Sequence, residues 1–169
     1  MAVVWFAGRP ASGKTTLANA VADRLRKDGE QVVVLDSDEL RNAIKPSHGF
    51  HPEGREAFYG TLANLAATFE GQGQVVLVAA TANLARYRQV ARQRATNFIE
   101  VYIDTPIDVC RQRDPKGLYA RAEADADNHL PGLGAAFEVP DDAEVVVRPG
   151  DDGTALVLGA LAQVPQKVR

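Results

Sequence analysis

Short apolar runs alternate with longer amphipathic segments along most of the chain. Five short runs are mainly apolar, and two of them, Val32–Leu35 and Val75–Val78, have no polar alternation, a pattern typical of strands buried on both faces. The predicted strands are Val3–Ala7, Gln31–Leu35, Gln74–Ala79, Phe98–Ile103 and Ala143–Val147. The segments between them have helical spacing, and a further short helix is expected to open at Pro106. The other predicted helices are Lys14–Lys27, Glu39–Ile44, Glu53–Glu70, Leu84–Thr96 and Gly153–Ala162.

This alternation predicts the fold class. A strand that is followed by a helix and another strand forms a crossover, and crossovers produce parallel sheets. We therefore expect an α/β fold in which a five-stranded parallel sheet carries helices on both faces. A length of 169 residues suits one domain covering residues 1–169. Residues 115–140, approximately, have no strand signal and little apolar periodicity, and we predict that they form a mobile lid.

Composition narrows the classes of function. A net charge of −3 argues against a general nucleic-acid binder. No apolar run approaches the roughly 18 residues of a membrane span, and the N-terminus lacks the basic leader of a signal peptide, so no membrane partner is expected. Cys110 is the single cysteine, which excludes an intrachain disulfide and favours a reducing cytoplasm. Its apolar neighbours predict a core position.

Basic residues gather in two places although the chain is acidic. A basic set inside an acidic protein indicates a local anionic ligand such as a nucleotide. The alternative for the helical arginines Arg88, Arg92 and Arg94 is a solvated helix face. The two sets are Arg86, Arg88, Arg92 and Arg94, and then Arg111, Arg113, Lys116 and Arg121.

A phosphate-binding motif lies between the first strand and the first helix. The segment matches G-x-x-x-x-G-K-[ST] in full and predicts a P-loop NTPase fold with ATP and Mg²⁺ as ligands. Its backbone N–H groups and the helix N-terminus would face the phosphates, Lys14 would reach the β- and γ-phosphates, and the Thr15 hydroxyl would ligate Mg²⁺. No guanine-reading Asn-Lys-x-Asp stretch is present, which weakens a GTPase interpretation. The nucleotide-binding residues predicted from the motif are Gly8, Arg9, Pro10, Ala11, Ser12, Gly13, Lys14, Thr15 and Thr16.

Two carboxylates follow the second strand. P-loop enzymes usually place an acid at the end of a neighbouring strand, where it positions Mg²⁺. The third strand ends in Ala79-Ala80-Thr81 and offers none, so Asp36 and Asp38 are the candidates for positioning Mg²⁺ and for accepting a hydroxyl proton. Which carboxylate does which is open, and Asp38 could instead cap the helix that follows it.

Several segments resemble the adenylylsulfate (APS) kinase family. The most specific is Val109–Tyr119, where Cys110 precedes Arg-Asp-Pro-Lys-Gly-Leu-Tyr. Leu35–Arg41, His48–Phe50 with the following Arg55-Glu56, and Ala136–Pro140 also resemble family segments, in register along nearly the whole chain. Members phosphorylate the ribose 3′-hydroxyl of adenosine 5′-phosphosulfate with MgATP and give PAPS. The resemblance implies this activity, a small-molecule acceptor and a homodimer.

The resemblance also implies roles for individual residues. Asp38 or Asp36 would activate the acceptor hydroxyl, Lys116 would neutralise charge on the transferring group, and Arg113 would lie against the ATP adenine. Arg41 and Arg55 would hold acceptor oxygens, and Phe50 would stack on the acceptor base. The implied substrate-binding set is Arg41, Phe50, Arg55, Asn83, Arg86, Lys116 and Leu118; the catalytic set is Lys14, Asp36, Asp38 and Lys116.

The chain departs from the family pattern on the acceptor side. Asn83–Ala85 replaces Ser-Pro-Tyr, Ala57 and Tyr59 replace Asn and Arg, and Leu130–Gly134 replaces the lid segment Phe-Thr-Gly-Ile-Asp. Two alternatives therefore stay open. One is a related kinase acting on another nucleotide conjugate or small hydroxylated metabolite, and the other is a P-loop ATPase or switch without a dedicated acceptor.

Overall fold

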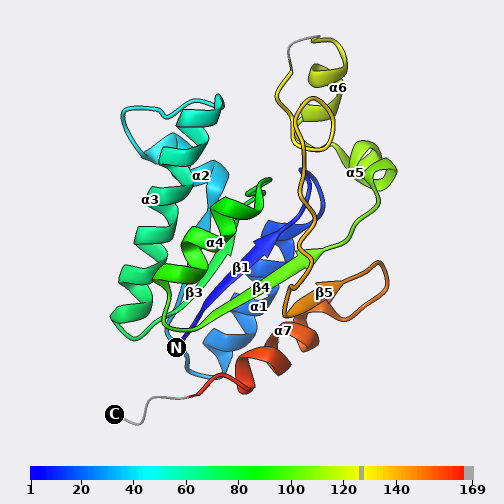
Figure 1. Cartoon of the computed structure of the whole chain (residues 1–169). Coiled ribbons are helices and arrows are strands. Elements are labelled where there is room, and N and C mark those ends of the chain that lie inside the picture. The colour runs from blue at the N-terminus through cyan, green and yellow to red at the C-terminus, as the bar shows by residue number, and fades with distance from the viewer. Residues whose placement is uncertain (126–127, 166–169) are drawn as a thin grey trace.

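A computed structural model describes residues 1–125 and 128–165, and its five strands form one parallel sheet in the order β2-β3-β1-β4-β5 (Figure 1). All four strand pairs are parallel. The strands are β1 (Val3–Ala7), β2 (Val32–Asp36), β3 (Val75–Ala79), β4 (Phe98–Ile103) and β5 (Val145–Val147). The predicted α/β fold class is confirmed, and β1, whose five residues are all buried, lies at the centre of the sheet.

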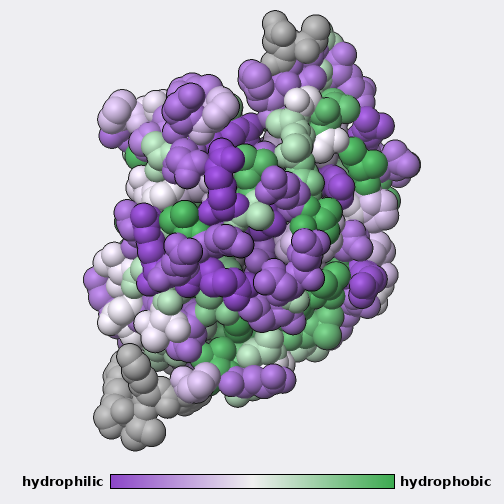
Figure 2. Space-filling view, in the orientation of Figure 1, coloured by the Kyte–Doolittle hydropathy of each residue, from purple (hydrophilic) through white to green (hydrophobic). Residues whose placement is uncertain are grey.

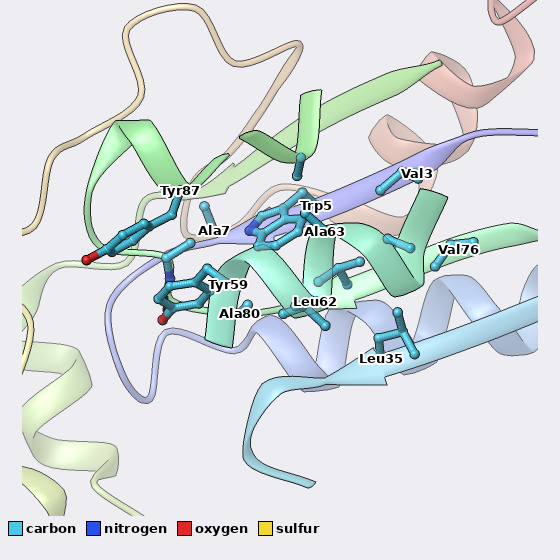
Figure 3. Packing of buried hydrophobic residues seen from close by; sticks show 14 of the residues in the cluster. Val3, Trp5, Ala7, Leu35, Tyr59, Leu62, Ala63, Val76, Ala80 and Tyr87 are labelled. Atoms are coloured by element: carbon cyan, nitrogen blue, oxygen red, sulfur yellow. Dashed lines mark hydrogen bonds between the residues drawn. The ribbon is translucent and has the colours of Figure 1, made fainter. Parts of the chain in front are cut away.

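Helices cover both faces of the sheet. On one face, α3 and α4 bury Phe58, Leu62 and Tyr87 in one cluster with Trp5 of β1, and Figure 3 shows part of this cluster. On the other face, α1 and α7 pack against the alternate residues of the same strands, Phe6 among them. The helices are α1 (Lys14–Lys27), α2 (Ser37–Ala43), α3 (Pro52–Gly71), α4 (Ala85–Arg94), α5 (Ile107–Arg113), α6 (Leu118–Glu123) and α7 (Gly153–Ala162).

Helix α6 lies inside the predicted lid and was not predicted. The Asp114 carboxylate accepts hydrogen bonds from the N–H groups of Leu118, Tyr119 and Ala120, so it satisfies the first turn. Gly117 enters the helix with φ of 62°, a left-handed conformation that glycine adopts without strain. A six-residue helix is too short to show periodicity. Residues 126–127 of the predicted lid lie outside the described residues.

Helix α2 is capped by Asp36 and not by Asp38. Asp36 is the N-cap residue, and its side chain accepts from the N–H groups of Asp38 and Glu39. The alternative in which Asp38 caps this helix is therefore wrong, because the helix begins at Ser37, before Asp38.

A buried ion pair joins α4 to the sheet. Arg88 Nε lies 2.5 Å from Glu100 Oε1, and the two side chains are only 3% and 6% exposed. The Arg88 guanidinium also donates to the carbonyls of Ala82 and Glu138, so it ties α4 to the end of the predicted lid. The interpretation of Arg88 as part of a solvated helix face is wrong, whereas Arg92 is one-third exposed and pairs with Glu144. None of the helices in the described residues is long and apolar enough to cross a membrane.

Glu100→Gln should destabilise the fold strongly. Removing one partner of a buried pair leaves the other charge uncompensated, and we expect the free energy of unfolding to fall by about 3–5 kcal/mol in urea titrations. Glu56→Gln is the matched control, since it breaks an exposed pair with Arg86 and should leave the free energy of unfolding almost unchanged. An equal fall in the free energy of unfolding in both variants would contradict the conclusion that burial makes the Arg88–Glu100 pair costly to break.

Candidate active site

The phosphate loop follows β1 and leads directly into α1, and its two motif glycines are required by its shape. Gly13 has φ of 107°, a conformation that side-chain-bearing residues rarely adopt. A Cβ on Gly8 would lie 2.6 Å from Ser12 Oγ and 3.1 Å from the carbonyl oxygen of Ile103. The loop is therefore curled tightly against the carboxyl end of the sheet, where open α/β sheets bind ligands.

Lys14 is held by the loop itself. Its Nζ donates to the carbonyl oxygens of Gly8, at 3.0 Å, and Arg9, at 2.8 Å. Burial of the ammonium lowers the pKa of Lys14 to about 8, an effect that the nearby carboxylates of Asp38 and Asp36 only partly oppose. Desolvation thus disfavours the charged form of Lys14, and a bound anion would stabilise that form.

A hydrogen bond connects Thr15, in the first turn of α1, to Asp36, the N-cap residue of α2. The Thr15 hydroxyl donates to Asp36 Oδ2 at 2.6 Å, and Asp36 Oδ1 accepts the two N–H groups of the α2 cap. Asp36 is 8% exposed, so its orientation is fixed by these contacts. No cluster of three or more His, Cys, Asp or Glu residues able to hold a metal occurs within residues 1–125 and 128–165. A hydroxyl and one carboxylate fit Mg²⁺, which keeps water and phosphate among its ligands.

One large cavity of about 1470 Å³ opens beside the loop. Pro10–Thr16 form its floor, α2 and α3 contribute one side, and the predicted lid contributes the other, including Leu118, Leu130 and Pro131. In the space-filling view the lid stands apart from the tips of α2 and α3, and polar side chains border the notch between them (Figure 2).

Arg113 lines one end of the cavity, next to the phosphate loop. Its guanidinium lies 3.9 Å from the point that a Cβ on Gly13 would occupy. The loop Arg148–Gly153, between β5 and α7, closes this end of the cavity, with Arg148, Pro149, Asp151 and Gly153 in the lining. Sequence reasoning missed this loop, although the Pro149-Gly150 turn after the last strand marks another segment at the carboxyl edge of the sheet.

Lys116 and Asp38 meet across the cavity. Lys116 Nζ lies 2.5 Å from Asp38 Oδ2, and both side chains are more than half exposed. The hydrogen bond to Asp38 raises the pKa of Lys116. The two residues are far apart in the sequence, so the pair connects the start of α2 to the root of the lid.

The opposite end of the cavity is cationic and aromatic. The Arg41 guanidinium lies 3.8 Å from the ring centroid of Phe58 and 4.6 Å from that of Phe50, and it donates to the carbonyl of Gly49. Burial lowers the pKa of Arg41. Phe50 is 60% exposed, which leaves much of its ring open to a ligand.

Arg55 is buried and holds three segments together. It donates to the carbonyls of Phe50 and His129 and to the side-chain oxygen of Asn83. One edge still lines the cavity. Arg55 therefore joins α3 to the lid in addition to facing the site.

Four predicted site residues do not line the cavity. Asn83 is buried between Arg55 and the carbonyl of Ala136, and Arg86 pairs with Glu56 at 2.9 Å. Gly8 and Arg9 contribute carbonyls to Lys14 but no cavity wall. The binding roles of these four residues stay predictions.

Tyr59 lines the cavity and was noted in the sequence only as a departure from the family pattern. Its hydroxyl accepts from the N–H of Ala82 at 3.1 Å, and its ring stacks on Tyr87 with centroids 4.7 Å apart. A phenol thus takes the place of a cation on the acceptor side.

Sequence comparisons with known proteins show the family. The model of a family described as adenylylsulphate kinase matches residues 1–148. An adenylyl-sulfate kinase of Paraburkholderia xenovorans is 40% identical over 148 residues, which cover 87% of this chain and 83% of that protein. An adenylyl-sulfate kinase of a Synechococcus strain is 36% identical over 160 residues, covering 95% and 91%.

A solved structure has the same architecture. The APS kinase of Mycobacterium tuberculosis, determined in complex with AMPPNP and APS, superposes with a TM-score of 0.87 at 32% identity and covers 95% of each chain. The predicted P-loop NTPase fold is confirmed.

Nucleotide binding should be accompanied by proton uptake near pH 8. With its pKa at about 8, Lys14 is about half neutral at that pH, and bound phosphates would restore its charge. Titration calorimetry of an ATP analogue with Mg²⁺ in buffers of different ionisation enthalpy should show an uptake of about half a proton at pH 8 and little at pH 6.5. An uptake that does not change between these pH values would contradict the lowered pKa of Lys14.

Proposed function

This chain belongs to the adenylylsulphate kinase family, and we propose from its site how it transfers a phosphoryl group from ATP to APS. It is an ATP-dependent phosphotransferase with a hydroxyl acceptor. In the reaction the ribose 3′-oxygen bonds to the γ-phosphorus, the bond to the ADP oxygen breaks, and the hydroxyl proton is released. The observation that carries the proposed assignment of roles is the meeting of the phosphate loop, the Asp38–Lys116 pair and Arg41 around one cavity.

ATP would bind along the phosphate loop. The loop N–H groups and the N-terminus of α1 attract its phosphates, and Lys14 would exchange its carbonyl partners for phosphate oxygens. The adenine would occupy the end beside Arg113, where a guanidinium and the Arg148–Gly153 loop offer a planar cation and a wall for a base.

Mg²⁺ would be held by the Thr15 hydroxyl and, through water, by Asp36. These two oxygens are already together, and neither is committed to another cation in the described residues. When bound, the ion would neutralise the β- and γ-phosphate oxygens.

Asp38 would serve the acceptor hydroxyl. Asp36 uses both oxygens to bind Thr15 and the α2 backbone, whereas Asp38 is 62% exposed and its side chain bonds only Lys116 among the described residues. We therefore assign metal positioning to Asp36 and proton acceptance to Asp38. Lys116, released from Asp38 by the substrates, would face the transferring group.

The acceptor would lie at the aromatic end. Phe50 offers an exposed ring for the adenine of APS, and Arg41 and Arg55 supply guanidinium groups for its phosphosulfate. Leu118 adds an apolar contact in the lining. Leu130, also in the lining, cannot stack as an aromatic ring would, which is the observation that supports the alternative of another nucleotide conjugate as acceptor.

Three further predictions accompany this function. We propose that residues 1–169 form one domain with a lid at about 115–140. We also propose the homodimer that the family resemblance implies. A cytoplasmic location is the third proposal, and it suits a free, buried Cys110.

The test of the function is ADP release from MgATP with a panel of acceptors, APS first. We expect APS to accelerate release strongly and Lys14→Met to abolish it without loss of helical structure by circular dichroism, because Lys14 serves charge and not core packing. Acceleration by another hydroxyl compound and not by APS would favour the alternative acceptor, and hydrolysis that no acceptor accelerates would favour a switch.

Asp36→Asn and Asp38→Asn should affect different kinetic quantities, the Mg²⁺ requirement and kcat respectively. Asp38→Asn should lower kcat by roughly 100-fold or more, since general-base groups typically contribute that much, while the Mg²⁺ concentration for half-maximal rate stays unchanged. Asp36→Asn should raise that Mg²⁺ concentration. Steady-state rates over a Mg²⁺ titration measure both effects, and a reversed pattern would exchange the two roles.

A further inference from the structure

Arg9 is a loop residue whose side chain points away from the phosphate-binding cavity. Its guanidinium lies over the ring of Phe137, with its carbon 5.3 Å from the centroid. A Cβ on Gly132 would lie 3.2 Å from Arg9 Cδ, so the chain at Gly132 rests directly on the Arg9 stem. Burial raises the pKa of Tyr102, and the nearby charge of Arg9 opposes that rise. The Arg9 side chain is thus packed against the second half of the lid, residues 128–138.

The main chain of Arg9 contacts the donor site. Its carbonyl accepts from Lys14 Nζ at 2.8 Å and from the N–H of Ser12 at 3.1 Å. Phosphates that recruit Lys14 would remove the first of these bonds, so the Arg9 peptide changes partners when the donor binds. One residue therefore touches the donor site with its backbone and the lid with its side chain.

The lid segment that Arg9 supports belongs to the acceptor side. Residues 128–138 include Leu130 and Pro131, which line the cavity. Within the same segment the carbonyl of His129 accepts from Arg55, and the carbonyl of Ala136 accepts from Asn83. Phe137 stacks on Tyr102 with centroids 6.2 Å apart, which fixes the ring that Arg9 covers.

We propose that Arg9 is a positioning residue that couples nucleotide binding at the phosphate loop to the acceptor-side lid segment 128–138. This proposal rests on the proposed function for the identity of the acceptor, but not for the coupling itself. Coupling requires a structural element whose conformation depends on both ligands. Arg9 meets this requirement, because its peptide contacts the donor site and its side chain packs against the lid. The other half of the lid has its own contact with the loop, from the Tyr119 hydroxyl to the carbonyl of Pro10.

The experiment measures coupling in full-length Arg9→Met, which keeps the stem of the side chain and removes its charge. APS affinity is determined by calorimetry with and without saturating MgAMPPNP, a donor analogue. In the unmodified chain we expect the nucleotide to tighten APS binding by about tenfold, within the usual range for coupled sites. In Arg9→Met the ratio should fall to within about twofold of unity, and the affinity for MgAMPPNP alone is measured in the same titrations.

Hydrogen exchange of residues 128–138 gives a second readout that needs no acceptor. MgAMPPNP should slow exchange there in the unmodified chain and leave it unchanged in Arg9→Met. If APS fails to bind at all, the proposed acceptor is wrong, and this arm still decides the role of Arg9.

Two further variants keep the proposal testable. Phe137→Leu removes the partner of Arg9 from the lid side and should reproduce the loss of coupling, which also covers a failure of Arg9→Met to fold. Arg24→Met is the matched control, because Arg24 forms an exposed pair with Asp28 and should leave the coupling unchanged. A retained ratio in Arg9→Met, or a loss of nucleotide affinity as large as the loss of coupling, would overturn the proposal.

Discussion

The site depends on the carboxylate of Asp36. One of its oxygens accepts the Thr15 hydroxyl, and the other caps α2, so a single buried group fixes the start of α1 relative to the start of α2. Because Asp36 takes the cap, the next acid along the helix, Asp38, is left exposed and turned toward Lys116. Two neighbouring carboxylates thereby acquire different environments, and a difference in environment is what allows similar groups to perform different chemistry.

The two halves of the lid are fastened in different ways. The first half is organised by Asp114, which caps α6, and by Tyr119, whose hydroxyl reaches the phosphate loop. The second half is fastened by arginines that donate to its carbonyls, Arg55 to His129 and Arg88 to Glu138. Arginine suits this task because its fork carries several donors in a fixed plane. The acceptor side is therefore built on guanidinium groups that satisfy backbone oxygens.

The regular part of the fold follows from local pattern. The bounds of β1, α1, β4 and α7 agree with the prediction residue for residue, because short, mainly apolar runs mark the strands, and longer apolar or amphipathic segments between turn residues mark the helices. The phosphate loop was found for a similar reason, since its glycines, lysine and threonine occupy fixed spacing. Helix α6, the Asp36 cap and the buried Arg88 were not found, because each depends on a partner that no local pattern reveals. The orientation of Arg9 and the pairing of Lys116 with Asp38 likewise depend on chain segments that meet only in the fold.

The self-contained bonding of Lys14 has a consequence for selectivity among cellular anions. A bare ammonium in an empty loop would attract any small oxyanion, and inorganic phosphate is abundant in cells. Here the ammonium already donates to two carbonyls, so an anion must compete with those bonds before it gains the lysine. A single phosphate offers few oxygens for that exchange, whereas a triphosphate also occupies the remaining loop N–H groups and compensates for the loss. A triphosphate, which has more oxygens than a single phosphate, would therefore be the better able to replace the two bonds of Lys14.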